Sequence, residues 1–141
     1  MRRVDRLFES YGRYHQNPVN KAIHWICVPL IVWSVLGMLW AASALAAVAV
    51  IAAATLFYLF LSLPLACGML AVLAGMAWLL TLFGDRLLMI SLLTFVAAWA
   101  GQFIGHVIEG RKPAFVDDLR SFLVAPAWLV SDVYRRLGLR Y

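Results

Sequence analysis

The sequence predicts an all-α integral membrane protein, a four-helix bundle with amphipathic interfacial helices at both ends. Composition is the first reason, because the chain is 65% hydrophobic and only 13% charged, far from the norms of a soluble domain. The second reason is two long uncharged runs, one between Lys21 and Asp85 and one from Leu87 to Ile108. A membrane helix needs about 20 apolar residues. The first run therefore holds up to three helices and the second holds one.

These runs assign the whole chain, residues 1–141, to a single membrane domain. Membrane helices are expected at about 18–41, 44–62, 65–83 and 87–109, with an interfacial helix at 1–16 and interfacial helices within 115–138. Pro126 should divide the last segment into two pieces. For the middle of the chain, two half-spanning helices that return to the same side are an alternative.

The basic residues set the expected orientation. The net charge is +5, and every lysine and arginine except Arg86 lies before the first uncharged run, at its edge, or after the last one. This is the positive-inside pattern, so both termini should be cytoplasmic, in a membrane that we expect to be the bacterial inner membrane. Basic ends on a hydrophobic chain indicate contact with lipid headgroups in the bilayer and not with nucleic acid.

The first residues follow a helical rhythm. Val4, Leu7, Phe8 and Tyr11 lie at i, i+3, i+4 and i+7, which predicts an amphipathic helix on the bilayer surface. His15 comes four residues after Tyr11 and should point toward the bundle if the helix reaches that far.

Ionisable residues at the ends of the spans predict a site. His24 lies near the start of the first span, while His106 and Glu109 share a helix face where the last span ends. Both ends are expected on the cytoplasmic side, and His15 is only nine residues before His24. The three histidines and Glu109 can therefore meet at one depth, where ionisable groups are costly without partners.

Imidazoles with a carboxylate suit zinc, copper, nickel or iron, and two histidines with one carboxylate are typical of non-haem Fe(II) oxygenases. The predicted metal ligands are His15, His24, His106 and Glu109. Other polar residues would act in catalysis by orienting ligands or substrate, and these are Asn17, Asn20 and Gln102, together with Glu109. Structural roles are the alternative: Asn17 as a helix cap, and Glu109 paired with Arg111 or Lys112. Gly101 and Gly105 form a G-x-x-x-G step that would allow a neighbouring helix to approach closely.

Four segments share one resemblance. They are YHQNPVNKAIHWICVP at Tyr14 to Pro29, QFIGHVIEGRKPA at Gln102 to Ala114, LVAP at Leu123 to Pro126 and LGLR at Leu137 to Arg140. Together they resemble the Mpo-type family of membrane 2-hydroxy fatty acid dioxygenases. The sequence departs from that pattern with Gly110 where a basic residue is expected and Asp132 where glutamate is common.

The resemblance implies an Fe(2+)-dependent enzyme of fatty acid α-oxidation, which uses O2 to remove one carbon from a 2-hydroxy fatty acid as CO2. It places the histidines of that family at His15, His24 and His106 and its acidic residue at Glu109. The substrate carboxylate would then meet basic residues at the interface, namely Lys21, Arg111 and Lys112.

Two other functions fit the residues. A membrane cytochrome would use His24 and His106 as axial haem ligands, which leaves His15 without a role. A non-enzymatic scaffold or lipid-binding protein would need no metal, and its histidines should tolerate glutamine.

Overall fold

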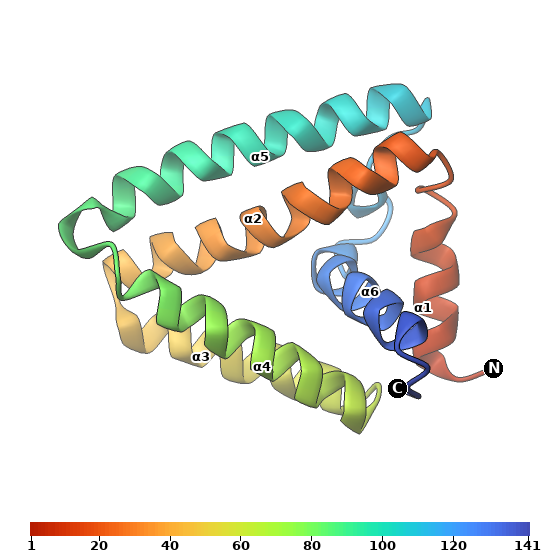
Figure 1. Cartoon of the computed structure of the whole chain (residues 1–141), viewed down its shortest axis with the longest axis horizontal. Helices are drawn as coiled ribbons and strands as arrows, with labels where there is room; N and C mark the ends of the chain where they lie inside the picture. Colours follow the sequence, from red (N-terminus) through yellow and green to blue (C-terminus); the bar gives the residue numbers. More distant parts are fainter.

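The computed structural model describes all 141 residues, and it contains helices and no strands. Figure 1 shows the chain from the N-terminal helix α1 to the C-terminal helix α6, with both termini at the same end of the molecule. The elements are α1 (Arg3–Gly12), α2 (Pro18–Ala42), α3 (Ala44–Leu59), α4 (Leu63–Leu80), η1 (Gly84–Arg86), α5 (Leu87–Glu109), η2 (Ala114–Val116) and α6 (Ser121–Arg136).

The four long apolar helices form two pairs that diverge from a common end. Helix α2 packs along α5, and α3 packs along α4. Figure 1 shows the two pairs spreading apart toward the end where α6 lies between them. The helices expected from the sequence are therefore present, but they do not close into one four-helix bundle. A cavity lined by residues of α2, α3, α4 and α6 lies in the wedge between the pairs.

Three helical segments are long and apolar enough to cross a membrane: Pro18–Ala42, Leu63–Leu80 and Gly84–Glu109. Helix α3 has only 16 residues, about 24 Å at 1.5 Å per residue, which is shorter than the hydrocarbon core of a bilayer. Three of the four expected spans therefore have the length and hydropathy of a membrane helix, and the expected count of four is not confirmed. Ser43 and Ser62 begin α3 and α4 as N-caps, accepting hydrogen bonds from Ala46 N and Leu65 N.

Glycines allow α2 and α5 to lie close together. A Cβ atom added at Gly101 would be 2.6 Å from Cys27 Sγ, and one added at Gly105 would overlap Asn20 Oδ1. The predicted G-x-x-x-G step therefore faces α2 and brings polar groups of the two helices into contact. On α4, by contrast, a Cβ at Gly75 would meet no atom within 4 Å.

The terminal helices cover the open end of the wedge. Val4, Phe8 and Tyr11 are buried, because the apolar face of α1 packs against α6. The expected amphipathic helix is therefore present, and its apolar face is turned toward the rest of the protein. One correction concerns Pro126, which lies inside one continuous α6. Proline there removes a single hydrogen bond, and the other turns of the helix continue past it.

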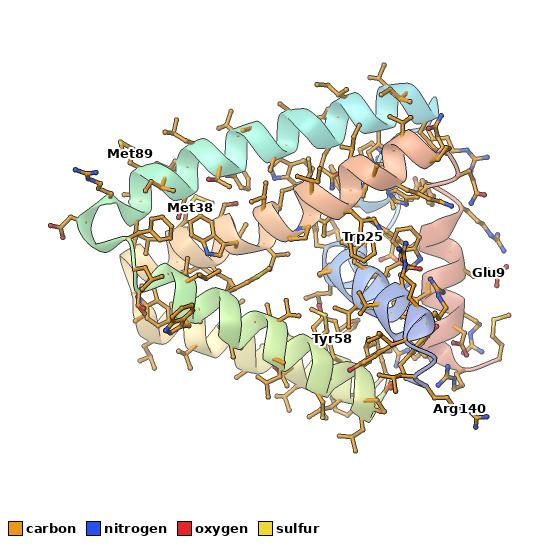
Figure 2. All side chains as sticks on the ribbon, in the orientation of Figure 1. Glu9, Trp25, Met38, Tyr58, Met89 and Arg140 are labelled. Carbon is orange, nitrogen blue, oxygen red and sulfur yellow. The ribbon has the colours of Figure 1, made fainter.

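Charged and apolar surfaces separate along the molecule. Figure 2 shows Glu9 and Arg140 at the end that carries α1 and α6, and Met89 at the opposite end. The outer faces of the long helices expose large apolar side chains, among them Leu45, Phe60, Trp78 and Val96. Such surfaces suit a lipid environment. The cytoplasmic placement of the charged end stays a prediction.

Candidate metal centre

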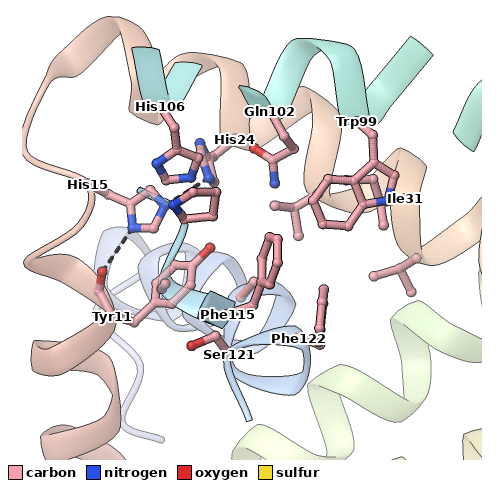
Figure 3. Close-up of a pocket in the computed structure, with 15 residues that line it drawn as sticks. Tyr11, His15, His24, Ile31, Trp99, Gln102, His106, Phe115, Ser121 and Phe122 are labelled. Carbon is pink, nitrogen blue, oxygen red and sulfur yellow. Dashed lines mark hydrogen bonds between the residues drawn. The ribbon is translucent and has the colours of Figure 1, made fainter. Parts of the chain in front are cut away.

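Three histidines from separate parts of the chain meet in the interior. Ring centroids are 4.1 Å apart for His15 and His24, 5.2 Å for His15 and His106, and 5.0 Å for His24 and His106. One ligand atom from each lies within 4.8 Å of the others. The side chains are nearly inaccessible, with exposures of 1%, 1% and 6%. Figure 3 shows the three rings turned toward one another.

The elements that carry these histidines explain the convergence. His24 is in the second turn of α2, and His106 is in the last turn of α5. The two helices run antiparallel and in close contact, so these turns lie side by side. His15 lies beyond the end of α1, in a turn in which its backbone N–H donates to Gly12 O at 3.0 Å. This turn directs the His15 ring back under the other two.

The hydrogen bonds of two of the imidazoles define their tautomers. His15 Nδ1 lies 2.9 Å from Tyr11 O, and His24 Nδ1 lies 2.9 Å from Asn20 O. A carbonyl oxygen can only accept, so both Nδ1 atoms carry hydrogen. In the neutral rings each Nε2 then presents a lone pair, and these two atoms are 2.8 Å apart.

A cation between the two Nε2 atoms would relieve the repulsion of facing lone pairs. A shared proton is disfavoured, because burial lowers the pKa of His15 to about 4 and favours the neutral ring. Neutral imidazole is the form that binds metal, and a second nitrogen held by a carbonyl is the usual support for such a ligand. His106 Nδ1 is buried with no partner in the protein. The cluster therefore fits a transition-metal ion.

Glu109 lies beside this cluster and binds the loop that carries His15. Its Oε1 accepts from Gln16 N at 2.8 Å, and its Oε2 accepts from Asn17 N at 2.9 Å and Asn20 Nδ2 at 3.0 Å. The potential ligand group contains the three histidines without Glu109. Asn17 also caps α2, accepting from Val19 N at 2.8 Å. The carboxylate thus joins the end of α5 to the start of α2.

Gln102 faces the cavity next to the histidines, one helical turn before His106 (Figure 3). It is 7% exposed, and its Oε1 has no hydrogen-bond partner, which is also true of Asn20 Oδ1. Buried amide oxygens without partners are uncommon. Gln102 is therefore available to a molecule bound in the cavity.

The three basic residues expected to meet a carboxylate differ in their surroundings. Lys112 forms an ion pair with Asp117 at 2.6 Å, and Arg111 Nη1 donates to Arg13 O at 3.1 Å. Lys21 is half-buried and has no ion pair. His106, Arg111 and Lys112 share a surface cleft of about 330 Å³ on the outer side of the histidines.

Several residues of the site were not among those predicted from the sequence. Tyr11 stacks on His15 at a centroid distance of 4.3 Å and supplies its carbonyl acceptor, which the four-residue spacing could have indicated. Trp99, Phe115 and Phe122 line the inner cavity of about 50 Å³ that opens from the histidines. Phe115 and Phe122 follow the last span, where only the folded chain returns them to the site.

Comparison with known proteins supplies the family. The chain matches the family described as "2-hydroxy-palmitic acid dioxygenase Mpo1-like" over residues 1–137. It is 35% identical over 136 residues to the 2-hydroxy-palmitic acid dioxygenase MPO1 of Saccharomyces cerevisiae, covering 91% of this chain and 78% of that protein. No solved structure matches the chain. On the full-length family match and this identity, the chain belongs to the Mpo1-like family.

Proposed function

We propose that this protein is an Fe(II)-dependent dioxygenase that shortens a 2-hydroxy fatty acid by one carbon. The name of the yeast relative supports the substrate class and the use of O2. The reaction balances when one 2-hydroxy acid and one O2 give the acid one carbon shorter, CO2 and water. The structural observation that carries the proposal is the pair of Nε2 atoms facing each other at 2.8 Å in a buried site.

The residues that would hold the ion are His15, His24 and His106. Bound Fe(II) would supply the electron transfer that O2 requires and a Lewis acid for the hydroxyl and carboxylate oxygens. The chain supplies the rest. The carbonyls of Tyr11 and Asn20 hold two rings in one tautomer, and burial keeps bulk water from the reacting atoms.

We assign Glu109 to positioning rather than to direct ligation. Both of its oxygens already accept hydrogen bonds, and the donors Gln16 N and Asn17 N immediately follow His15. Charge-assisted bonds of this kind are stronger than neutral ones. Asn20 has a similar supporting role through its amide, while Asn17 caps α2.

Gln102 and the basic cleft are the proposed contacts to the substrate head. Gln102 can donate its amide N–H or accept through the free Oε1. The substrate carboxylate would bind beside His106, in the cleft that Arg111 and Lys112 also line. Lys21 lies on the first turn of the adjacent helix α2.

The geometry disfavours haem. The ring centroids of His24 and His106 are 5.0 Å apart, and the third imidazole lies against both. The adjoining cavity of about 50 Å³ is too small for a porphyrin.

The decisive experiment uses the full chain purified anaerobically in detergent. We expect elemental analysis to find about one iron per chain. Incubation with 2-hydroxypalmitate and O2 should give pentadecanoate, which mass spectrometry detects. Iron-free protein that stays inactive after Fe(II) is added, or a haem absorption band, would contradict the proposal.

A further inference from the structure

A second, larger cavity adjoins the cavity at the histidines. The first, of about 50 Å³, is lined at one end by the histidines and at the other by Ile31, Val32 and Phe122. The same three residues line a cavity of about 230 Å³, here called the tail cavity. It lies in the wedge between α2, α3, α4 and α6. Figure 3 shows Ile31 and Phe122 on the side of the pocket away from the histidines.

The tail cavity has almost no polar surface. All but one of its 12 lining residues are hydrophobic. Its one hydroxyl, on Tyr58, already donates to Leu123 O at 2.8 Å. An apolar cavity of this kind stays dry and accepts hydrocarbon. A polar site that opens into such a cavity matches a molecule with a polar head and a long apolar tail.

The dimensions of α2 set the length of that tail. His24 lines the first cavity and Leu36 lines the tail cavity, and the two residues are separated by about 18 Å along the helix at 1.5 Å per residue. An extended chain advances about 1.2 Å per bond. The distance corresponds to about 15 bonds, which is the length of a long-chain acyl group.

We propose that the acyl tail of the 2-hydroxy acid passes between Ile31 and Phe122 into the tail cavity, where Ala54 on α3 limits the chain length accepted. This inference rests on the proposed function for the identity of the head group. Ala54 is half-buried and faces the cavity. It lies one helical turn before Tyr58 on α3, and its small side chain leaves room for the tail.

A different exit for the tail is the outer face of α5. Phe95, Trp99 and Phe103 line an open groove there, which also touches Phe122. A tail in this groove would lie against lipid and would meet no end wall. Chain length would then have little influence on turnover, and substitutions in α3 would have none.

Two variants separate these routes. Ala54→Phe fills the tail cavity, while Ala53→Phe adds the same ring to an exposed position on the same helix. We expect Ala54→Phe to lower kcat/KM for 2-hydroxypalmitate by about tenfold or more. Turnover of 2-hydroxyoctanoate should stay within about twofold, because its shorter tail ends near Ile31. Ala53→Phe should change neither.

Equal activity of Ala54→Phe and wild type on both substrates would overturn the inference, as would an equal loss on both in protein that retains its iron. If Ala54→Phe is not monodisperse in detergent, Ala54→Leu makes the same comparison with a smaller side chain.

Photolabelling tests the route without turnover. A 2-hydroxypalmitate analogue with a diazirine at its last carbon should label residues 50–54 of α3 or the facing part of α4. Label confined to residues 95–103 would overturn the inference. Wild-type protein that is labelled in α3 but does not turn over either acid would count against the proposed function and leave the tail cavity supported.

Discussion

The α2–α5 pair and the α3–α4 pair are similarly apolar in sequence, yet they differ in the number of polar side chains that they bury. Between α2 and α5 lie buried polar groups: Asn20, His24, Ser34, Ser91, Gln102 and His106. The α3–α4 pair buries a single polar side chain, Tyr58. In an apolar environment each buried polar group needs a partner, so the first pair must be placed accurately while the second needs only to pack.

The difference teaches how a small membrane protein can combine a rigid site with room for a substrate. Glycines hold α2 and α5 close enough for polar contacts. The other pair diverges and is joined to α6 by two tyrosine hydroxyls, Tyr58 to Leu123 O at 2.8 Å and Tyr134 to Pro64 O at 2.7 Å. Under the proposed function, the α2–α5 pair would hold the reacting groups, while α3 and α4 would close the tail cavity against α2 and α6.

The largest expected effect comes from removing an imidazole. Alanine at His15, His24 or His106 should reduce iron content and 2-hydroxypalmitate turnover by at least about 100-fold, because each ring supplies one of three donors. Elemental analysis and a product assay measure this. The matched control is Thr55→Val, which deletes a half-buried hydroxyl of the α3–α4 pair. Normal iron content and turnover in any histidine variant would contradict the site.

Glu109→Gln should have the next largest effect, a fall of about 10- to 100-fold in iron affinity. The charge that attracts Gln16 N, Asn17 N and the Asn20 amide is lost, so the loop bearing His15 is held less firmly. Iron titration followed by anaerobic spectroscopy measures the affinity. Glu9→Gln, on the exposed face of α1, is the control. A variant in which iron affinity is unchanged and turnover alone is lost would point instead to a direct role in the reaction.

Glycine substitutions compare the two helix pairs directly. Gly101→Ala and Gly105→Ala should each destabilise the protein by about 1–3 kcal/mol, because the added Cβ meets Cys27 or Asn20. Gly75→Ala on α4 meets nothing and should be neutral or stabilising, by up to about 1 kcal/mol, through helix propensity. Thermal unfolding in detergent measures all three. Equal behaviour of Gly75 and Gly105 variants would show that the pairs do not differ in packing.

The smallest effect is expected at the surface. Lys112 and the hydroxyl of Tyr14 lower the pKa of Asp117, which links the loop before α2 to η2. A lowered pKa in the folded state adds stability that is present above the ordinary carboxyl pKa and is lost as the pH falls through the folded value. Asp117→Asn should therefore be slightly less stable than wild type near neutral pH. The difference should vanish in acid and shrink with salt.

Much of the helical pattern could be predicted from the sequence. The bounds of α5 agree with the expected 87–109, because Arg86 precedes it and Gly110 ends it with a positive φ of 73°. Helix α2 begins at Pro18 behind the Asn17 cap, as expected. The packing of α3 and α4 could not be predicted from the sequence, because a helix that is apolar on all sides has no distinct face that indicates its neighbour.

The site, like the fold, could be predicted from the sequence only in part. The predicted topology brought His24 close to His106. The four-residue spacing from Tyr11 predicted that His15 points toward the bundle. Spacing could not show that Glu109 meets three donors of the α1–α2 loop, because partners across a fold depend on loop geometry. The proposed function replaces the metal-ligand role predicted for Glu109 with a positioning role, and the roles of Lys21, Arg111 and Lys112 stay predictions.

The facing Nε2 atoms of His15 and His24 also have a thermodynamic consequence. Their repulsion belongs to the folded chain alone, since in the unfolded chain the two rings separate in water. An ion that binds between them therefore favours folding by linkage, and each tenfold rise in its free concentration above Kd adds about 1.4 kcal/mol. Melting temperature then reports occupancy directly, so metals can be ranked on this protein before any substrate is in hand.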